Sequence, residues 1–269
     1  MEAKNLYKKI FHSFQRSFQL NRAFSRTDKK ILEKLERYRA HTITFLGKKL
    51  EIVDSLTFLS SYDEIFNNSI YKFHSGEKNI IIVDCGANIG LATIYFKKLY
   101  PDAHIVAFEP DPNIFNSLKK NIKSFGFENV FCKNEAVSCK DELINFKMEG
   151  GHSGMITKNE GLDISRVKAI RLKSFLKNYK KITFLKIDIE GEEVNVIPDI
   201  ADDLLKVDYL FLEYHSFIDG PQKLDELLKN VSNAGMRYYI KEAANKNSPF
   251  INREIFLKMD MLVNIFCYR

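Results

Sequence analysis

The stretch IIIVDCGANIG, residues 80–90, decides how this chain folds. Residues 80–83 are apolar and have the length of a buried strand, which Asp84 ends. Gly86 and Gly90 then stand where a tight turn leads into a helix, and glycine there lets the backbone approach a ligand. The spacing is D-x-G-x-x-x-G, whereas dinucleotide-binding folds have G-x-G-x-x-G, because Asn88 replaces the second glycine.

This loop favours a ligand without phosphates, since the Asn88 side chain stands where a pyrophosphate would sit. The carboxylate of Asp84 favours a cationic ligand, and S-adenosylmethionine (SAM) carries both a sulfonium and an ammonium group. Glu109 follows Asp84 by 25 residues, at the end of the next expected strand. An acid in that place can accept hydrogen bonds from both ribose hydroxyls. The alternative is a generic α/β turn with a surface glutamate.

Beyond residue 79, short apolar runs alternate with helical stretches, which predicts βαβ units and a parallel sheet. Asp111 followed by Pro112 is a favourable helix start. We therefore expect an α/β, Rossmann-like fold. The expected strands are 80–84, 104–109, 130–134, 183–188, 209–215, 236–241 and 261–268, and the expected helices are 91–99, 112–124 and 221–234.

The residues before this pattern are expected to form a separate segment. Residues 1–40 indicate a basic amphipathic helical arm, with a second helix from Thr27 or Asp28 to Tyr38, and residues 42–53 indicate a hairpin. The expected division is 1–75, a dimerisation arm or lid, and 76–269, the domain that binds SAM. Adhesion of the arm to an anionic membrane surface or an anionic partner is the alternative.

Composition limits the class of protein. The chain has 269 residues, 45% of them hydrophobic, and a formal charge of +6, typical of a globular protein. Residues 1–40 hold 11 basic and 4 acidic residues, and the other residues hold 30 and 31, so the main body is neutral and no nucleic-acid partner is expected. No apolar run reaches the roughly 18 residues of a membrane span. Four scattered cysteines and the lack of a signal peptide indicate the cytoplasm.

Acidic residues and a histidine follow two of the expected strands. Lys186, Asp188 and Glu190 alternate on one strand, and Glu213 and His215 on the next. We expect Lys186 to pair with a neighbouring acid. The carboxyl ends of parallel strands are where ligands bind. His215 is the candidate general base, oriented by Asp188 or Glu213. Alternatively Asp188, Glu213 and His215 bind Fe, Mn or Mg, or His215 makes only structural hydrogen bonds.

The chain resembles the FkbM family of SAM-dependent methyltransferases. The matching stretches are VDCGANIG (83–90), FEPDP (108–112), NEAVS (134–138), FLKIDIEGEE (184–193) and LEYH (212–215). The resemblance implies a seven-stranded sheet with helices on both faces and an antiparallel last strand. It implies that the cofactor contacts Asp84, Gly86, Asn88, Gly90 and Glu109, with Asn134 and Ala136 beside the adenine. Where members often have T-L-D, this chain has Arg171-Leu172-Lys173.

We therefore expect a SAM-dependent O-methyltransferase that acts on a hydroxyl of a sugar or nucleotide-linked sugar, in surface-glycan biosynthesis. Glu190 contacts the substrate or caps a helix, and His152 and Ser153, in the glycine-rich loop 150–154, contact it or form a surface turn. The alternatives are a natural-product O-methyltransferase and a degenerate fold that serves as a binding module. Amine methylation is less favoured, because residues 188–191 read Asp-Ile-Glu-Gly and not Asn/Asp-Pro-Pro-aromatic.

Overall fold

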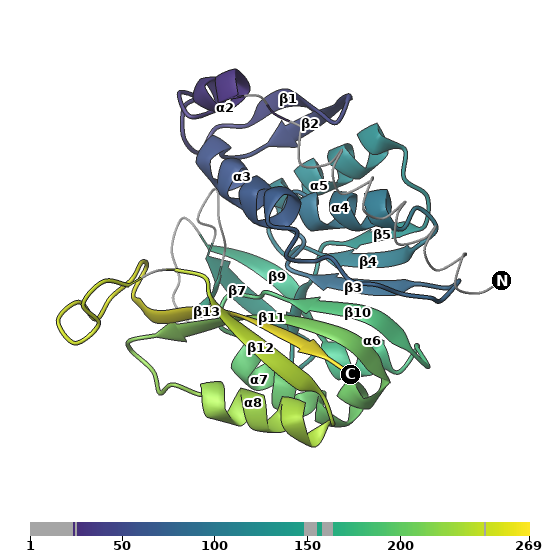
Figure 1. The fold of residues 1–269 in the computed structure, drawn as a ribbon, viewed down its shortest axis with the longest axis vertical. Coiled ribbons are helices and arrows are strands. Elements are labelled where there is room, and N and C mark those ends of the chain that lie inside the picture. Colours follow the sequence, from purple (N-terminus) through teal and green to yellow (C-terminus); the bar gives the residue numbers. More distant parts are fainter. Residues whose placement is uncertain (1–23, 25, 148–154, 158–163, 245) are drawn as a thin grey trace.

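A seven-stranded sheet runs through the molecule in the order β12-β13-β11-β10-β3-β4-β5 (Figure 1). The computed structural model describes residues 24, 26–147, 155–157, 164–244 and 246–269. The five strands from β11 to β5 are parallel to one another, and β13 is antiparallel to β11 and β12. This confirms the expected fold class. The bounds are β3 (Ile81–Cys85), β4 (His104–Phe108), β5 (Val130–Lys133), β10 (Ile182–Ile187), β11 (Val207–Phe217), β12 (Arg237–Glu242) and β13 (Met259–Tyr268).

Helices cover both faces of this sheet, as expected (Figure 1). On one face lie α4 (Leu91–Leu99) and α5 (Pro112–Phe125). On the other lie α6 (Leu172–Leu176), α7 (Glu193–Asp199), the 3₁₀ helix η2 (Ala201–Lys206) and α8 (Leu224–Asn233). Each face has its own hydrophobic core, which the sheet separates. Helix α8 begins three residues later than the sequence pattern predicts, at Leu224 rather than Pro221.

The predicted start of α5 is confirmed in atomic detail. The Asp111 carboxylate accepts hydrogen bonds from the backbone N–H groups of Asn113, at 2.7 Å, and Ile114, at 3.2 Å. Pro112 occupies the first turn, where its missing N–H costs nothing. The helix ends at Gly126, whose φ of +66° is the left-handed conformation of a helix C-terminus.

The residues before β3 pack onto the α4 and α5 face. They form α2 (Arg26–Leu32), the hairpin β1 (His41–Phe45) and β2 (Lys48–Ile52), α3 (Ser55–Tyr62) and the π-helix η1 (Asp63–Asn67). Phe45 is fully buried in the same core as α4 and α5. Glu51 and Asn121 of α5 exchange two hydrogen bonds, of 2.7 and 2.9 Å. The division at residues 75 and 76 stays a prediction, but the described part of this segment shares a core with the sheet.

The second N-terminal helix is shorter than expected. The periodicity predicts a helix to Tyr38, whereas α2 ends at Leu32. Tyr38 has a φ of +56°, which an α-helix does not allow, and its N–H donates to the Asp54 carboxylate at 3.0 Å. Arg37 pairs with the same carboxylate at 2.6 Å. These tertiary contacts outweigh the helical preference of the local sequence. Most of the predicted arm, residues 1–23, lies outside the described residues.

A smaller sheet, which the sequence analysis did not predict, lies beside the main one. Its strands are β6 (Ala136–Ser138), β7 (Glu142–Lys147), β8 (Met155–Thr157) and β9 (Ile164–Arg171), in the order β6-β9-β7-β8. Two of these strands have only three residues, too few to show an alternating pattern. The glycine-rich loop 150–154 lies outside the described residues. Among the helices that the structure describes, none is long and apolar enough to cross a membrane.

Candidate active site

The loop at the carboxyl end of β3, residues 86–90, will be called the glycine loop. Its two glycines are needed for different contacts. Gly86 and Gly90 have φ angles of +83° and +91°, which side chains strongly disfavour. A Cβ atom on Gly86 would lie 1.9 Å from the backbone oxygen of Asp188. A Cβ atom on Gly90 would lie 2.7 Å from the Leu118 side chain of α5. Glycine thus allows the loop to lie directly against β10 and α5.

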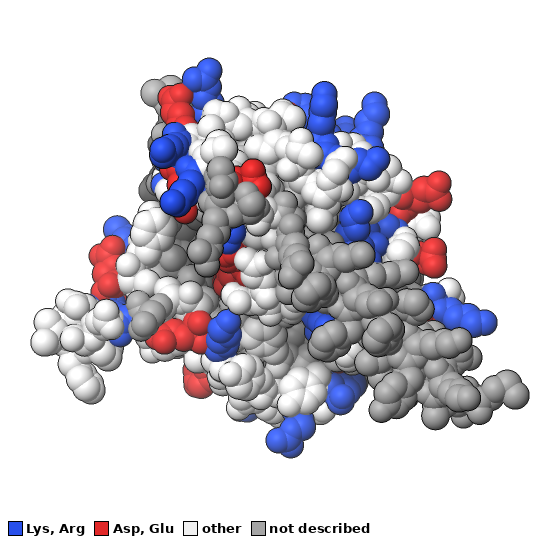
Figure 2. Space-filling model, turned by 45° about the horizontal axis from the view of Figure 1, so that its top comes forward, with Lys and Arg blue, Asp and Glu red and all other residues white. Residues whose placement is uncertain are grey.

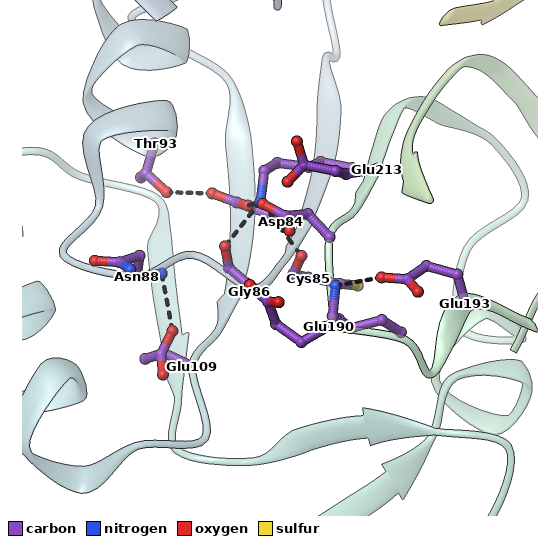
Figure 3. Close-up of polar contacts among 12 residues, drawn as sticks. Asp84, Cys85, Gly86, Asn88, Thr93, Glu109, Glu190, Glu193 and Glu213 are labelled. Atoms are coloured by element: carbon purple, nitrogen blue, oxygen red, sulfur yellow. Dashed lines mark hydrogen bonds and ion pairs between the residues drawn. The ribbon is translucent and has the colours of Figure 1, made fainter. Parts of the chain in front are cut away.

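Asp84 lies beneath this loop and is fully buried. One carboxylate oxygen accepts a hydrogen bond of 3.0 Å from the Thr93 hydroxyl (Figure 3), and the other lies 3.4 Å from Lys186 Nζ. Asp84 lines neither of the two cavities described below. It therefore supports the loop from below, and its predicted direct contact with a cofactor stays a prediction.

Lys186 joins the ends of β3 and β10. Its ammonium group donates to the backbone oxygen of Gly86 at 2.8 Å and pairs with Asp188 at 3.0 Å, which confirms the expected pairing with an acid. Burial opposes the charge of Lys186, but Asp188 and Asp84 outweigh that effect and raise its pKa well above the usual value. The buried lysine is therefore a permanent cation that holds the loop against the neighbouring strand.

Glu109 follows β4 and closes the other side of the loop. Its carboxylate accepts hydrogen bonds of 2.9 Å from the backbone N–H groups of Asn88 (Figure 3) and Asp111. Burial raises the pKa of Glu109 to about 8, although these two hydrogen bonds favour the charged form. Each carboxylate oxygen has a further lone pair, so Glu109 retains the capacity to accept hydroxyl groups.

His215, on β11, lies between several glutamates. Its Nδ1 is 3.2 Å from Glu193, and its Nε2 is 3.3 Å from Glu190 and 3.7 Å from Glu213. Burial disfavours the imidazolium, but Glu193 and Glu190 outweigh it and raise the pKa of His215 well above its usual value. The orienting group at Nδ1 is thus Glu193, whereas the sequence analysis assigned this role to Asp188 or Glu213.

Glu193 is the residue that sequence reasoning missed on this side. It is fully buried, and its carboxylate accepts hydrogen bonds from the N–H groups of Ile189, at 2.9 Å, and Gly191, at 2.8 Å. It therefore fixes the turn before α7 and the His215 ring together. Glu193, and not Glu190, satisfies the N–H groups of this turn. The signal in the sequence was its place three residues after Glu190, in the same D-I-E-G-E-E stretch.

Asp188 and Glu213 meet beside His215. Burial alone would raise the pKa of Asp188, but Lys186 and His215 lower it. Burial and the nearby Asp188 raise the pKa of Glu213 well above its usual value. Ligand atoms of Asp188, Glu213 and His215 lie within 4.8 Å of one another, close enough for one cation.

Two cavities adjoin at this edge of the sheet. The first is lined by Glu109, Ala136, Phe108, Ile114 and Val137, among others. The second has a volume of about 310 Å³ and is lined by Glu213, His215 and Lys186, together with parts of α3, η1 and β13. Both are lined by Gly86, Asn88, Asp188 and Glu190, which therefore form their common wall.

The remaining predicted residues fall in different places. Ala136 lines the first cavity, but the Asn134 amide donates to the backbone oxygens of Glu109 and Pro110 and is not among the lining residues. His152 and Ser153 lie outside the described residues. Arg171, at the position of the sequence departure, forms a two-pronged ion pair with Asp199 at 2.6 and 3.0 Å and lines neither cavity.

The sheet order, the glycine loop and the acid after the second strand define the class of SAM-dependent methyltransferases. The chain belongs to the FkbM family within that class, because the family model described as "Methyltransferase FkbM domain" matches residues 84–245. The resemblance noted from the sequence is thereby confirmed.

Two methyltransferases are among the similar curated sequences. Methyltransferase 1 of Beauveria bassiana (strain ARSEF 2860) is 26% identical over 166 residues, which cover 53% of this chain and 67% of that protein. Methyltransferase sdnD of Sordaria araneosa is 27% identical over 177 residues, which cover 53% and 68%. Among solved structures, a SAM-dependent methyltransferase from Agrobacterium tumefaciens matches with a TM-score of 0.49 and 10% identity, over 87% of this chain and 70% of that one.

Proposed function

We propose that this FkbM-type methyltransferase transfers the methyl group of SAM to a hydroxyl of a sugar or nucleotide-linked sugar. The observation that carries the proposal is the pair of cavities that share Gly86, Asn88, Asp188 and Glu190 as a wall. A methyl donor in the first cavity and an acceptor in the second would meet at that wall. Methyl transfer needs this in-line approach, because the sulfonium already activates the methyl group.

The first cavity fits SAM by the chemistry of its walls. Glu109 offers carboxylate oxygens for ribose hydroxyls, and Phe108, Ile114 and Val137 offer apolar surface for the adenine. Gly86 and Asn88 bring backbone close to the place where the two cavities adjoin. When bound, SAM supplies the electrophilic methyl group, and the protein orients the acceptor and removes its proton.

In this proposal His215 takes the proton from the acceptor hydroxyl. Glu193 contacts Nδ1 of the ring. The other nitrogen, Nε2, is directed toward Glu190 and Glu213, which line the second cavity. Because the pKa of His215 is raised, the imidazolium must first lose a proton before it can act as a base. A cationic cofactor that binds nearby favours that loss, since like charges repel.

A divalent cation held by Asp188, Glu213 and His215 is a second candidate role for the same residues. The observation in its favour is that Glu193 accepts from Nδ1, the usual arrangement when the other imidazole nitrogen binds a metal. Against it, Lys186 already neutralises Asp188 at 3.0 Å. In a metal site the cation would lower the pKa of the acceptor hydroxyl and fix its position.

A methyl-transfer assay tests the proposal. The protein is incubated with SAM labelled in the methyl group and with a panel of sugars, nucleotide-linked sugars, hydroxylated natural products and amines, and labelled products are identified by mass spectrometry. We expect methyl ethers. Products methylated only on nitrogen would overturn the assignment to oxygen. Titration calorimetry with SAM distinguishes an active enzyme from a degenerate binding module without cofactor.

The assay also separates the two roles of His215. For a general base, EDTA leaves the rate unchanged, and the rate of the wild type rises with pH, because only the neutral imidazole accepts a proton. At saturating SAM, His215→Asn should lose at least about a hundredfold in rate and show a flat pH profile. A metal site predicts instead that EDTA abolishes activity and that Mg²⁺, Mn²⁺ or Fe²⁺ restores it.

A further inference from the structure

The second cavity is bounded by a helical segment that precedes the family domain. Thr57, Ser60, Ser61 and Glu64 of α3 and η1 line this cavity. Their spacing of three and four residues places them on one face of the helix. The opposite face is apolar, and Tyr62 and Phe66 are buried in the core. The polar face of this helical segment, residues 57, 60, 61 and 64, will be called the polar stripe.

The end of the polar stripe has an unusual backbone. α3 continues directly into η1, whose hydrogen bonds span five residues, as between the N–H of Asn68 and the oxygen of Asp63 at 2.8 Å. A π-helical turn adds a residue to the helical repeat and is frequent at functional sites. Here the π-helical turn includes Glu64, which lines the same cavity as Asp188, Glu213 and His215.

Part of the cavity lining is apolar. Phe256, Leu257, Met259 and Leu262 form this part, from the end of the β12–β13 connection and from β13. This connection projects from the body of the molecule, at the left of Figure 1. An acceptor held in this space would meet hydroxyl and carboxylate groups as well as hydrocarbon.

The cavity carries more negative than positive groups. Glu64, Asp188 and Glu190 line it, against Lys186 and His215, and both cations already contact carboxylates. Glu213 lines it too, but burial and Asp188 raise its pKa and so favour its neutral form. In the view of Figure 2, both acidic and basic atoms are visible in a recess of the surface. Burial, followed by the charge of Asp188, raises the pKa of Glu64, as expected for a carboxylate that faces like charge.

We propose that the polar stripe is the acceptor-binding wall, with Glu64 as its specificity-determining residue, and that the acceptor is a hydroxylated compound of neutral or positive charge with an apolar face. This inference rests on the proposed function for the identity of the second cavity. It narrows that proposal, because an acceptor that places phosphate groups inside the cavity would be repelled by the carboxylates. An amino sugar or an uncharged glycoside could contact both the polar stripe and the apolar part of the lining.

The sign of the cavity potential can be measured without a known acceptor. In a background where Cys132 and Cys139 are replaced by serine, Ser60→Cys places a thiol on the polar stripe. Its rates of reaction with a trimethylammonium methanethiosulfonate and a sulfonate methanethiosulfonate are compared with those of Ser232→Cys, on the exposed surface of α8. We expect the ratio of cationic to anionic rates to be at least about tenfold higher at residue 60. Equal ratios at the two positions would overturn the charge assignment.

Glu64→Gln tests the specificity role. In the Ser60→Cys background it should lower the rate ratio severalfold, while calorimetry shows SAM affinity unchanged within about twofold. With an acceptor identified by the methyl-transfer assay, Glu64→Gln should raise the acceptor KM about tenfold or more and leave kcat nearly unchanged. Glu128→Gln, an exposed residue outside both cavities, is the matched control and should change neither quantity.

The outcomes separate the two proposals. If the wild type binds no SAM but the potential at residue 60 is negative, the proposed function fails and the charge of the cavity stands. If SAM binds and methyl transfer occurs, but Glu64→Gln leaves both the rate ratio and the acceptor KM unchanged, the polar stripe is not the acceptor wall. Preferential methylation of a nucleotide-linked sugar over its uncharged glycoside would likewise overturn the acceptor class.

Discussion

At the scale of single residues, the site depends on buried carboxylates that have different neighbours. Glu193 has its oxygens satisfied by two backbone N–H groups and the His215 ring. Burial and Asp188 raise the pKa of Glu213, and Glu109 lies between two backbone N–H groups. The contacts of Glu109 and Glu193 can each be tested, by a change of pH or by substitution with the isosteric amide.

Glu109 gives the first of these tests. Its pKa of about 8 means that it is mainly protonated at neutral pH in the free protein. Ribose hydroxyls donate to the carboxylate, so the affinity for SAM should increase as pH rises toward 8, by at most about tenfold per pH unit, and level off above it. Titration calorimetry between pH 6 and pH 9 measures this. Glu109→Gln should bind SAM weakly and without that pH dependence; a pH-dependent Gln variant would contradict the assignment.

The substitution Glu193→Gln gives the second test at the scale of single residues. The amide turns an N–H group toward donors that previously met a carboxylate, and a buried charge network broken on one side costs about 3 kcal/mol. We expect that loss in the free energy of unfolding by urea titration. The pKa of His215, followed by NMR, should fall, because Glu193 contributes most to raising it. Glu226→Gln, in the first turn of α8, is the control and should alter neither quantity. An unchanged His215 pKa would show that Glu193 does not orient the ring.

At the scale of elements, the glycine loop is fixed by contacts with β10 and α5. Gly86→Ala would bring a methyl group against the Asp188 backbone at 1.9 Å and force an alanine to a φ of +83°. We expect the free energy of unfolding to fall by more than about 2 kcal/mol and SAM binding to be lost. Gly76→Ala is the matched control, since a Cβ atom there would meet nothing within 4 Å beyond its chain neighbours. Wild-type SAM affinity in Gly86→Ala would refute this account of the loop.

The sequence predicted the elements of the main sheet well, because their patterns are local. Buried strands such as β3 are continuous apolar runs, and Asp111 and Pro112 mark the start of α5 in the sequence. The smaller sheet was not predicted, because its strands β6 and β8 are too short to show an alternation of apolar and polar residues. α2 was predicted too long because the contacts of Tyr38 and Arg37 with Asp54 join positions that sequence periodicity does not relate.

The candidate site was predictable only as far as single strands could reveal it. Asp188, Glu213 and His215 were expected together because they follow neighbouring parallel strands, and the structure places them within 4.8 Å. Glu193 was missed because it lies past the strand, in a turn whose geometry decides which carboxylate meets the ring. Glu64 was missed because nothing local relates residues before β3 to the far end of β11; the tertiary fold alone creates that cavity.

At the scale of the whole molecule, the segment before residue 76 contributes to the main core. Phe45 is fully buried, and its ring centroid lies 5.1 Å from that of Phe66 and 6.4 Å from that of Phe125 on α5. The hairpin also exchanges hydrogen bonds with Asn121 of α5. The polar stripe on α3 and η1 is therefore held in place by the same core that supports the sheet, so loss of hairpin packing should affect the whole domain.

Phe45→Ala tests this coupling. Removal of a fully buried phenylalanine leaves a cavity and costs about 3–5 kcal/mol. Because hairpin, α3 and α5 share one core, we expect a single unfolding transition, monitored by circular dichroism, with its midpoint shifted to lower urea and its slope unchanged. Leu143→Ala, at a residue that is 62% exposed on β7, should change the free energy of unfolding by less than about 0.5 kcal/mol. If Phe45→Ala instead produces an early separate transition while the main one stays in place, the N-terminal segment folds independently. The acceptor wall would then belong to a unit that can move relative to the cofactor loop.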